Sequence, residues 1–367
     1  MPATRLANFS PAMVEIDPTT VCNLRCVMCH NATGLQRAHY VDMATIESVR
    51  NLSLRSAHNI KVNLTGSGEF FCHPQWREIL AMLSQGKCDI LIFTNGILLE
   101  EKDIDFIWDQ TSVVRLNVSV DAASEKTYRR IRGEDFIKLT EILKRIGNHK
   151  NKRIFSLSMC IMKSNMSEMV DFCDYAAGVG ADGIIFQAIH DREYTPITTE
   201  DEYVFNREEI RVDFSDLHKA LTRSCEILDQ YNMFVKIDAR WPGAPLSEAM
   251  RGCLKRREDL ELKHSNDYNL NIKNIEGILH ENQLYPRCLL PWIELSRYAN
   301  RERYGWRVCC KSDLQSMLGG EYATMEEAWN SKENQEIREL ILKGKRPRQC
   351  LKQYCAIARE LEENPNS

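Results

Sequence analysis

The sequence lacks any long hydrophobic run. None of its apolar stretches approaches the roughly 20 residues that a helix needs to cross a bilayer. The first ten residues, MPATRLANFS, contain no apolar segment typical of a secretory signal. Neither sign of charge predominates, because 48 Lys and Arg stand against 52 Asp and Glu, a formal net charge of −4. This balance gives no electrostatic reason to expect nucleic acid or an anionic membrane as a partner. Because the sequence shows neither a membrane span nor a secretory signal, we predict a cytoplasmic protein.

Cysteine, in contrast, is abundant, with 14 residues among 367. A reducing cytoplasm argues against a disulfide framework, so clustered cysteines indicate metal binding and isolated ones indicate packing. The first cluster is formed by Cys22, Cys26 and Cys29. The second, looser group consists of Cys288, Cys309, Cys310, Cys350 and Cys355.

Six short strands alternate with helical segments over the first half of the chain. The predicted strands are rich in Val, Ile, Leu and Phe and cover residues 13–19, 60–66, 90–96, 113–121, 154–162 and 183–189. Between them, apolar residues recur at the helical period, as at Trp76, Ile79, Leu80 and Leu83. Parallel strands need crossover connections, so this alternation predicts an α/β fold with a parallel sheet. Polar residues gather just after the strand ends, at 65–69, 94–96 and 119–121.

A second, smaller region follows the β/α part. Residues 214–232 predict a helix with Ser215 or Asp216 as its N-cap, and the WPGAP stretch at 241–245 interrupts regular structure. We therefore place a barrel domain at 10–240, a linker or helical connection at 241–285, and a C-terminal domain at 286–358.

The C-terminal domain is predicted to contain a β-hairpin at 287–313 and a helix at 324–344. A capping box of Thr324 and Glu327 would begin the helix, and Gly344 would end it. One pair of thiols from the hairpin and one pair from the segment after the helix are the parts of a closed four-cysteine site: Cys288, Cys309, Cys350 and Cys355.

The first cysteine cluster has the spacing C-x3-C-x2-C. Three thiolates on one loop can hold three corners of a [4Fe–4S] cube and leave one iron open to a ligand from outside the protein. A tetrahedral zinc site would need a fourth ligand, for which His30 is adjacent in sequence. The remaining alternative is three thiols with no metal.

The segment CNLRCVMC resembles the cluster loop of the radical S-adenosylmethionine (radical SAM) enzymes. The resemblance continues in order along the chain, each match following a predicted strand: TGSGEFFCHP (65–74), TNGILL (94–99), VSVDAASEKTYRRIRG (118–133) and MKSNMSEM (162–169). It extends over essentially the whole chain. It implies a partial (β/α)6 TIM-like barrel with the active site at the carboxyl ends of the strands.

The resemblance also implies the cofactors and their ligands. In that family a three-cysteine [4Fe–4S] cluster binds SAM at its open iron and, with an electron from a donor such as flavodoxin or ferredoxin, cleaves it to a 5′-deoxyadenosyl radical. The implied cluster ligands are Cys22, Cys26 and Cys29. The implied SAM-binding residues are Gly66, Gly68, Glu69, Asn95, Ser119 and Asn165, with Glu69 accepting the SAM amino group. Ser67 replaces the middle glycine of the family's Gly-Gly-Glu segment, which affects the geometry of that loop.

The C-terminal cysteines resemble those of a SPASM or shortened twitch domain. Six cysteines after residue 250 are too few for a full SPASM domain, so the resemblance implies one auxiliary [4Fe–4S] cluster, held by Cys288, Cys309, Cys350 and Cys355. Two points stay open: Cys310 could replace Cys309, and the last pair is spaced C-x4-C where C-x2-C is usual. Structural zinc is the alternative metal.

The substrate is the least determined part. Auxiliary clusters of twitch enzymes resemble electron acceptors, so our first hypothesis is an oxidoreductase that oxidises or epimerises a small hydroxylated substrate such as a sugar or aminocyclitol. A peptide or protein maturase is the second hypothesis, disfavoured because only 21 residues precede Cys22. A non-catalytic metal-binding scaffold is the third. Cys253, in MRGCLKR, is a candidate hydrogen donor over the barrel mouth. Charged candidates for substrate binding are Glu15, Asp17, His190, Asp191, Arg192 and Arg240.

Overall fold

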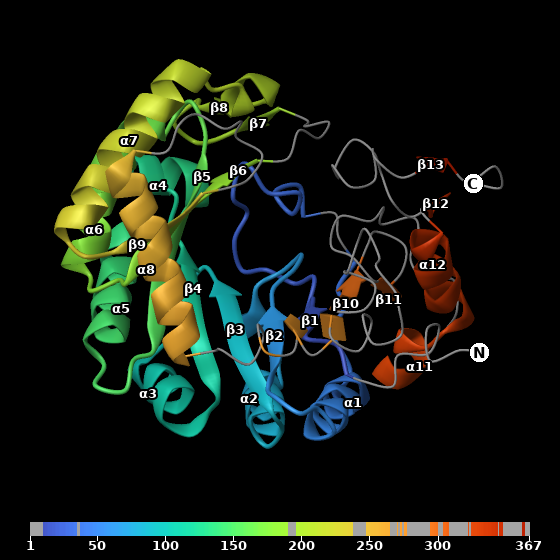
Figure 1. Ribbon diagram of the computed structural model, residues 1–367. Helices are drawn as coiled ribbons and strands as arrows, with labels where there is room; N and C mark the ends of the chain where they lie inside the picture. Colours follow the sequence, from blue (N-terminus) through green and yellow to red (C-terminus); the bar gives the residue numbers. More distant parts are fainter. Residues whose placement is uncertain are drawn as a thin grey trace. The chain divides into compact units, whose positions relative to one another are not determined.

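All six predicted strands are present in the computed structural model, which confirms the α/β class (Figure 1). The structure describes residues 10–34, 37–189, 196–237, 247–264, 270, 272–273, 275–276, 294–299, 304–307, 322, 324–343, 345–347 and 362–363. The chain divides into two units. The first consists of Met1–Val21, Arg37–Leu91 and Ser265–Ser367, and the second of Cys22–Gln36 and Ile92–His264.

The sheet of the first unit is built around β1 (Met13–Ile16). This strand pairs in parallel with β2 (Ile60–Leu64) on one side and with β10 (Glu294–Ala299) on the other. β11 (Tyr304–Arg307) pairs antiparallel with β10, so the order is β11-β10-β1-β2-β3, where β3 is Cys88–Thr94. The predicted hairpin is therefore present, and its first strand lies beside the first strand of the β/α region.

The helices of the first unit follow the sequence pattern with one difference. Its other elements are α1 (Met43–Leu54), a 3-10 helix (Phe70–Cys72), α2 (Trp76–Ser84), α11 (Met325–Trp329), α12 (Lys332–Leu342), β12 (Lys345–Arg346) and β13 (Glu362–Glu363). The Thr324–Glu327 capping box is confirmed at the start of α11. The single helix predicted there is wrong, because the Ser331 side chain accepts a hydrogen bond from the backbone N–H of Asn334 and begins a second helix.

In the second unit the strand order is β3-β4-β5-β6-β9, and residues of β3 belong to both units. Strands β4 (Val113–Ser119), β5 (Ile154–Ile161), β6 (Gly183–Ala188) and β9 (Phe234–Ile237) pair in parallel. The helices are α3 (Glu101–Gln110), α4 (Glu125–Arg132), α5 (Phe136–Asn148), α6 (Met169–Gly178), α7 (Phe214–Gln230) and α8 (Glu248–His264). Two 3-10 helices (Met166–Glu168 and Arg207–Ile210) and an antiparallel pair, β7 (Ile197–Thr198) with β8 (Val204–Phe205), complete it. None of the described helices has the length and apolar character needed to span a membrane.

The strands of the second unit are buried on both faces. All residues of β4 except Ser119 are buried, as is typical of parallel strands that helices cover. Among these residues are polar ones, since Asn117 in β4 and Ser156 and Ser158 in β5 are at most 1% exposed. They bond to one another: Ser156 Oγ donates to Asn117 Oδ1 (2.9 Å), and Asn117 Nδ2 donates to Ser158 Oγ (2.9 Å). Buried polar groups of this kind need such partners.

One helix begins at another residue than predicted, and a second lies in the predicted connection. The N-cap of α7 is Asp213, whose carboxylate accepts from the backbone N–H of Asp216 at 3.0 Å, and neither Ser215 nor Asp216 caps the helix. α8 lies within residues 241–285, for which a linker or helical connection is predicted. Its charged residues find partners elsewhere in the unit, as Glu261 does with the buried Arg115 of β4 at 2.7 Å. Hydrophobic periodicity does not detect a helix that depends on such contacts.

Candidate functional site

The cysteine loop begins the second unit and is held by its own backbone. The N–H of Cys29 donates to the carbonyl of Cys26 at 2.9 Å, which closes a tight turn between them. Two further backbone N–H groups point at sulfur: that of Leu24 at Cys22 Sγ and that of Asn31 at Cys29 Sγ, both at 3.4 Å. Hydrogen bonds accepted by sulfur favour the thiolate, which is the form that binds metal.

The number of thiols on the loop favours a cluster over a structural zinc ion. A structural zinc site is closed by four protein ligands, whereas three thiolates hold three corners of a [4Fe–4S] cluster and leave one iron open. Cys22, Cys26 and Cys29 offer three acceptor sulfurs on one loop, which fits such a cluster.

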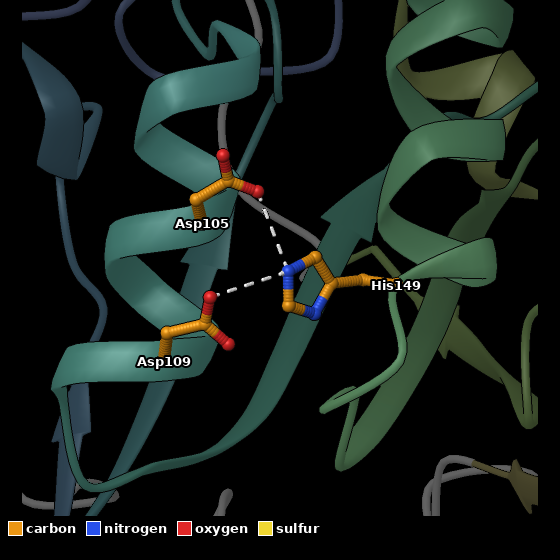
Figure 2. Close-up of side chains that lie close together, drawn as sticks. All are labelled: Asp105, Asp109 and His149. Carbon is orange, nitrogen blue, oxygen red and sulfur yellow. Dashed lines mark ion pairs between the residues drawn. The ribbon is translucent and has the colours of Figure 1, made fainter.

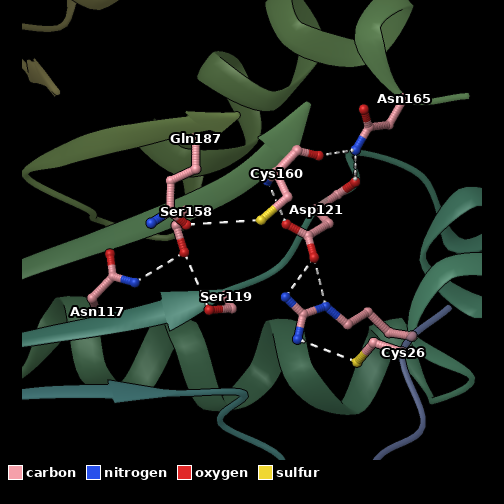
Figure 3. Close-up of polar contacts among 9 residues, drawn as sticks. Cys26, Asn117, Ser119, Asp121, Ser158, Cys160, Asn165 and Gln187 are labelled. Carbon is pink, nitrogen blue, oxygen red and sulfur yellow. Dashed lines mark hydrogen bonds and ion pairs between the residues drawn. The ribbon is translucent and has the colours of Figure 1, made fainter. Parts of the chain in front are cut away.

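Cys26 differs from the other two cysteines because it is buried against an ion pair. Its side chain is 7% exposed, and Arg132 Nη1 donates to its sulfur at 3.5 Å. Burial raises the pKa of the Cys26 thiol to about 11, and the positive charge of Arg132 opposes that rise. Arg132 is in turn paired with Asp121, whose Oδ2 accepts from Nε at 2.8 Å and from Nη2 at 2.5 Å. Figure 3 shows this connection from Cys26 to Asp121.

Asp121 follows β4 and is held on all sides. Its other oxygen, Oδ1, accepts from the backbone N–H of Cys160 at 2.7 Å, and its carbonyl accepts from Asn165 Nδ2 at 2.9 Å. The residue adopts a positive φ of 66°, which is unusual for a residue other than glycine. The carboxylate is therefore part of a buried ion pair at the strand end, a role that the sequence did not indicate.

Asn165 and Ser119, predicted to bind SAM, lie in the same network (Figure 3). Asn165 is fully buried; its Oδ1 accepts from Met162 N at 2.8 Å, and its Nδ2 donates to two main-chain carbonyls. Ser119 Oγ accepts from Ser158 Oγ at 3.2 Å. These bonds account for Asn165 as a residue that closes the turn after β5, whereas Ser119 ends β4 and is partly exposed.

Asn95 connects the end of β3 to the cysteine loop. Its Nδ2 donates to Asn23 Oδ1 at 2.8 Å, and its Oδ1 accepts from the backbone N–H of Ile97 at 3.0 Å. Since Asn23 directly follows Cys22, this bond fixes the first cysteine relative to the sheet. The structure thus places Asn95 beside the loop and gives it a positioning role.

The Gly-Ser-Gly-Glu segment lies in the first unit and packs against the chain that leads into the cysteine loop. A Cβ on Gly68 would lie 2.3 Å from the Thr19 carbonyl oxygen, and one on Gly66 would lie 2.2 Å from the Asp17 carboxyl group. Ser67 N donates to Asp17 Oδ1 at 3.0 Å. The two glycines are thus required by close packing within the protein, in addition to any approach of a ligand.

Glu69 ends this segment as a buried carboxylate. It is 3% exposed, its backbone N–H donates to the Val21 carbonyl at 2.9 Å, and its Oε1 accepts from the N–H of Phe71 at 3.3 Å. A buried carboxylate has a strong preference for a charged partner. The role of Glu69 as the acceptor for the SAM amino group stays a prediction.

Cys253 is not in the place expected from the sequence. It lies in α8, fully buried, and its thiol donates to the Cys225 carbonyl of α7 at 3.5 Å. Arg256 Nη2 lies 3.1 Å from the same sulfur. The prediction that Cys253 lies over the barrel mouth is wrong, because this thiol packs between two helices. Outside the described residues lie Cys288, Cys309, Cys310, Cys350, Cys355, His190, Asp191, Arg192 and Arg240.

Among the residues that the structure describes, one other group of side chains has the composition of a metal site. Asp105 and Asp109 of α3 face His149, whose Nε2 lies 3.3 and 3.8 Å from their carboxylates (Figure 2). The other ring nitrogen, Nδ1, accepts from the backbone N–H of Asn151 at 3.2 Å, so the proton of a neutral ring is on Nε2. That nitrogen then donates to the carboxylates and has no lone pair for a cation. We interpret the group as a surface ion pair that links α3 to the end of α5.

The comparisons with known proteins agree with this geometry. Residues 16–176 match the family model described as Radical SAM superfamily. The subtilosin biosynthesis protein AlbA of Bacillus subtilis is 21% identical over 184 residues, covering 49% of this chain and 40% of AlbA. A probable GTP 3′,8-cyclase of Pyrococcus horikoshii is 31% identical over 175 residues, covering 46% of this chain and 53% of the cyclase. The chain thus spans about half the length of these curated relatives.

Among solved structures, Streptococcus suis SuiB bound to S-adenosylmethionine superposes with a TM-score of 0.60 at 12% identity, covering 96% of this chain and 72% of SuiB. SuiB bound to its precursor peptide SuiA gives the same TM-score at 11% identity. At this identity the likeness establishes the α/β fold alone. The family match covers residues 16–176, less than half of the chain, and identifies a radical SAM region there; the cofactors of that family are a [4Fe–4S] cluster and SAM.

Arg132 is the site residue that sequence reasoning missed. It stands in the quoted segment TYRRIRG, where three arginines occur within four residues and look alike. The only available signal was its position one residue before Gly133, the glycine that ends α4 in the left-handed conformation. In the structure the Arg132 side chain is 9% exposed, whereas that of Arg129 is 68% exposed.

Proposed function

We propose that the protein is a radical SAM enzyme that modifies a peptide. The radical SAM part rests on one observation, the loop on which backbone N–H groups point at the sulfurs of Cys22 and Cys29. The substrate class is supported by two comparisons. AlbA is named for the biosynthesis of a bacteriocin, and SuiB, whose fold covers 96% of this chain, was solved with a precursor peptide.

In this proposal Cys22, Cys26 and Cys29 hold the cluster, which when bound supplies the electron that cleaves SAM. The chain's own residues bind and orient. Glu69 accepts the SAM ammonium group, because a buried carboxylate forms its strongest hydrogen bonds with a cation. Asn95 holds the loop through Asn23.

For the whole chain, we propose the domain organisation that the sequence predicts. The barrel would occupy 10–240, the connection 241–285 and the auxiliary domain 286–358. One auxiliary [4Fe–4S] cluster would be held by Cys288, Cys309 (or Cys310), Cys350 and Cys355. Four thiolates close a cluster to outside ligands, which suits electron transfer better than substrate binding.

A small-molecule substrate is the second candidate. The observation that favours it is the group of GTP 3′,8-cyclases at 29–33% identity, since their name specifies a nucleotide with a hydroxylated sugar. This keeps the hypothesis of a small hydroxylated substrate open, with oxidation or epimerisation as possible outcomes.

The test is anaerobic purification followed by reduction in the presence of SAM. We expect a brown protein with about eight irons, four per cluster, that forms 5′-deoxyadenosine. Cys22→Ala should abolish that product, and Cys173→Ala, a buried cysteine in α6, is the matched control. Colourless protein that holds zinc would contradict the proposal.

The substrate class is tested with two probes in parallel. Synthetic peptides encoded by short reading frames beside the gene, and GTP, are each incubated with SAM and reductant. A SAM-dependent change in the mass of a peptide supports the peptide-modifying function. Consumption of GTP, with every peptide unchanged, would favour the second candidate.

A further inference from the structure

We propose that Arg132 is a positioning residue for the cluster loop, and that its charge, aimed by Asp121, raises the reduction potential of the cluster held there. The proposal rests on the assignment of Cys26 as a cluster ligand. It concerns two residues that no motif singled out for this purpose. Three observations support it.

The first observation is that the end of α4 contacts the cysteine loop twice. Arg132 Nη1 donates to Cys26 Sγ at 3.5 Å. One residue earlier, the carbonyl of Ile131 accepts from the backbone N–H of Val27 at 3.0 Å. A main-chain bond next to a side-chain bond fixes both the position and the direction of the guanidinium. The loop is therefore attached to the helix at the cysteine itself.

The second observation is that the guanidinium cannot turn away. Two of its nitrogens bind the same oxygen of Asp121, at 2.8 and 2.5 Å. The side chains of Arg132 and Asp121 are 9% and 1% exposed, so water cannot replace either partner. The Cys160 N–H holds the second carboxylate oxygen at 2.7 Å. A planar guanidinium held by a fork of this kind has one available orientation, with Nη1 toward the sulfur.

The third observation is that this burial is specific to one arginine of α4. Arg129, three residues earlier, is 68% exposed and pairs with Glu125 on the same helix. Folding buries Arg132 at a cost that the ion pair must offset, because a buried charge without a partner is strongly unfavourable. The arrangement places one positive charge, partly neutralised, against one sulfur of the loop.

The consequence follows from electrostatics. Reduction adds a negative charge to the cluster and its thiolates, and a fixed positive charge nearby stabilises that state more than the oxidised one. Hydrogen bonds to cluster sulfurs act in the same direction and are among the known determinants of potential. Arg132 thus makes the cluster easier to reduce, and Asp121 moderates the effect while holding the guanidinium in place.

The experiment is a redox titration of the full chain, reconstituted anaerobically and followed by electron paramagnetic resonance. The signal to follow is the one that changes when SAM is added. We expect Arg132→Gln to shift its midpoint to a more negative potential than in the wild type, with Arg132→Lys in between because it keeps the charge but loses the fork. Arg129→Gln is the matched control and should leave the midpoint unchanged.

The outcomes separate this proposal from the proposed function. If Arg132→Gln retains the cluster and its midpoint potential equals that of Arg129→Gln, the proposed role of Arg132 is overturned. The assignment of the cluster ligands is then unaffected. If Arg132→Gln loses iron, Arg132→Lys decides: a retained cluster with an intermediate midpoint supports the proposal, and loss of iron there too overturns the electrostatic role. A wild-type protein with no SAM-sensitive signal would instead contradict the proposed function.

Discussion

The cysteines of the second unit lie in two environments that differ in the direction of their hydrogen bonds. In the loop, sulfur accepts: from Leu24 N at Cys22, from Asn31 N at Cys29 and from Arg132 at Cys26. In the helices, the thiol donates to a carbonyl, as Cys173 does to that of Met169 at 3.2 Å and Cys253 does to that of Cys225 at 3.5 Å, although Cys253 also accepts from Arg256. Donors beside a sulfur favour the thiolate over the thiol, and a carbonyl acceptor favours the protonated thiol.

The exposed fraction of the side chain does not distinguish the loop cysteines from the helical ones. Cys26 is 7% exposed and Cys173 is fully buried, and burial raises the pKa of both thiols, to about 11 and about 12. What separates them is the positive charge of Arg132, which opposes the rise at Cys26. For buried cysteines, the neighbouring donors are therefore a better guide to metal binding than exposure. Four predictions test this comparison, beginning with the largest effect.

Removal of a loop cysteine should have the largest effect. Cys26→Ala should lower the rate of SAM cleavage by at least about 100-fold, more than the loss typical of residues that only support a metal ligand. Iron content should fall with it. The check is iron analysis together with chromatography of 5′-deoxyadenosine. A Cys26→Ala protein with wild-type iron and activity would remove the distinction between the two environments.

Removal of a helical cysteine should affect stability alone. Cys173→Ala should lower the free energy of unfolding by about 1–3 kcal/mol, because it leaves a small cavity where α6 packs and removes a buried hydrogen bond. Denaturant titration measures the change. Iron content should equal that of the wild type. A loss of iron in the folded variant would show that Cys173 contributes to metal binding, contrary to this prediction.

The two arginines that contact cysteines should behave differently. Arg256 donates to Cys253 at 3.1 Å, as Arg132 does to Cys26, but it also pairs with Asp229 of α7 at 2.6 Å and with the Met233 carbonyl. Arg256→Gln should lower the free energy of unfolding by about 1 kcal/mol, the typical value of a partly exposed ion pair with its hydrogen bonds. The midpoint potential should not move. A shift equal to that of Arg132→Gln would show that the effect is not local.

Cys160 should give the smallest effect. It lies in β5 close to Asp121, but its thiol donates to Gln187 Oε1 at 3.8 Å, which places it with the helical cysteines. Cys160→Ala should change the free energy of unfolding by less than about 1 kcal/mol and leave iron unchanged. Thermal melting and iron analysis are sufficient. Loss of iron would show that closeness to the network matters more than the direction of the hydrogen bond.

Much of the fold could be predicted because its signals are local. The six strands are runs of Val, Ile, Leu and Phe. This composition is enough to predict that central strands such as β3 and β4 are buried on both faces. The apolar face of α2, with Ile79, Leu80 and Leu83 fully buried, follows from helical period. The split between α11 and α12 was missed because Ser331 inside a helical pattern resembles any other polar surface residue.

By itself, then, the sequence determined the class of fold and the loop of three thiols, since strand composition and the spacing of Cys22, Cys26 and Cys29 are properties of short segments. Only the tertiary structure decided which groups stand around those thiols. Arg132 meets Cys26 across 106 residues, and β10 meets β1 across more than 250 residues. It also decided that Cys253 packs between helices. The physical reason is that a buried charge or thiol is defined by the partners that replace water, and folding brings those partners from distant parts of the chain.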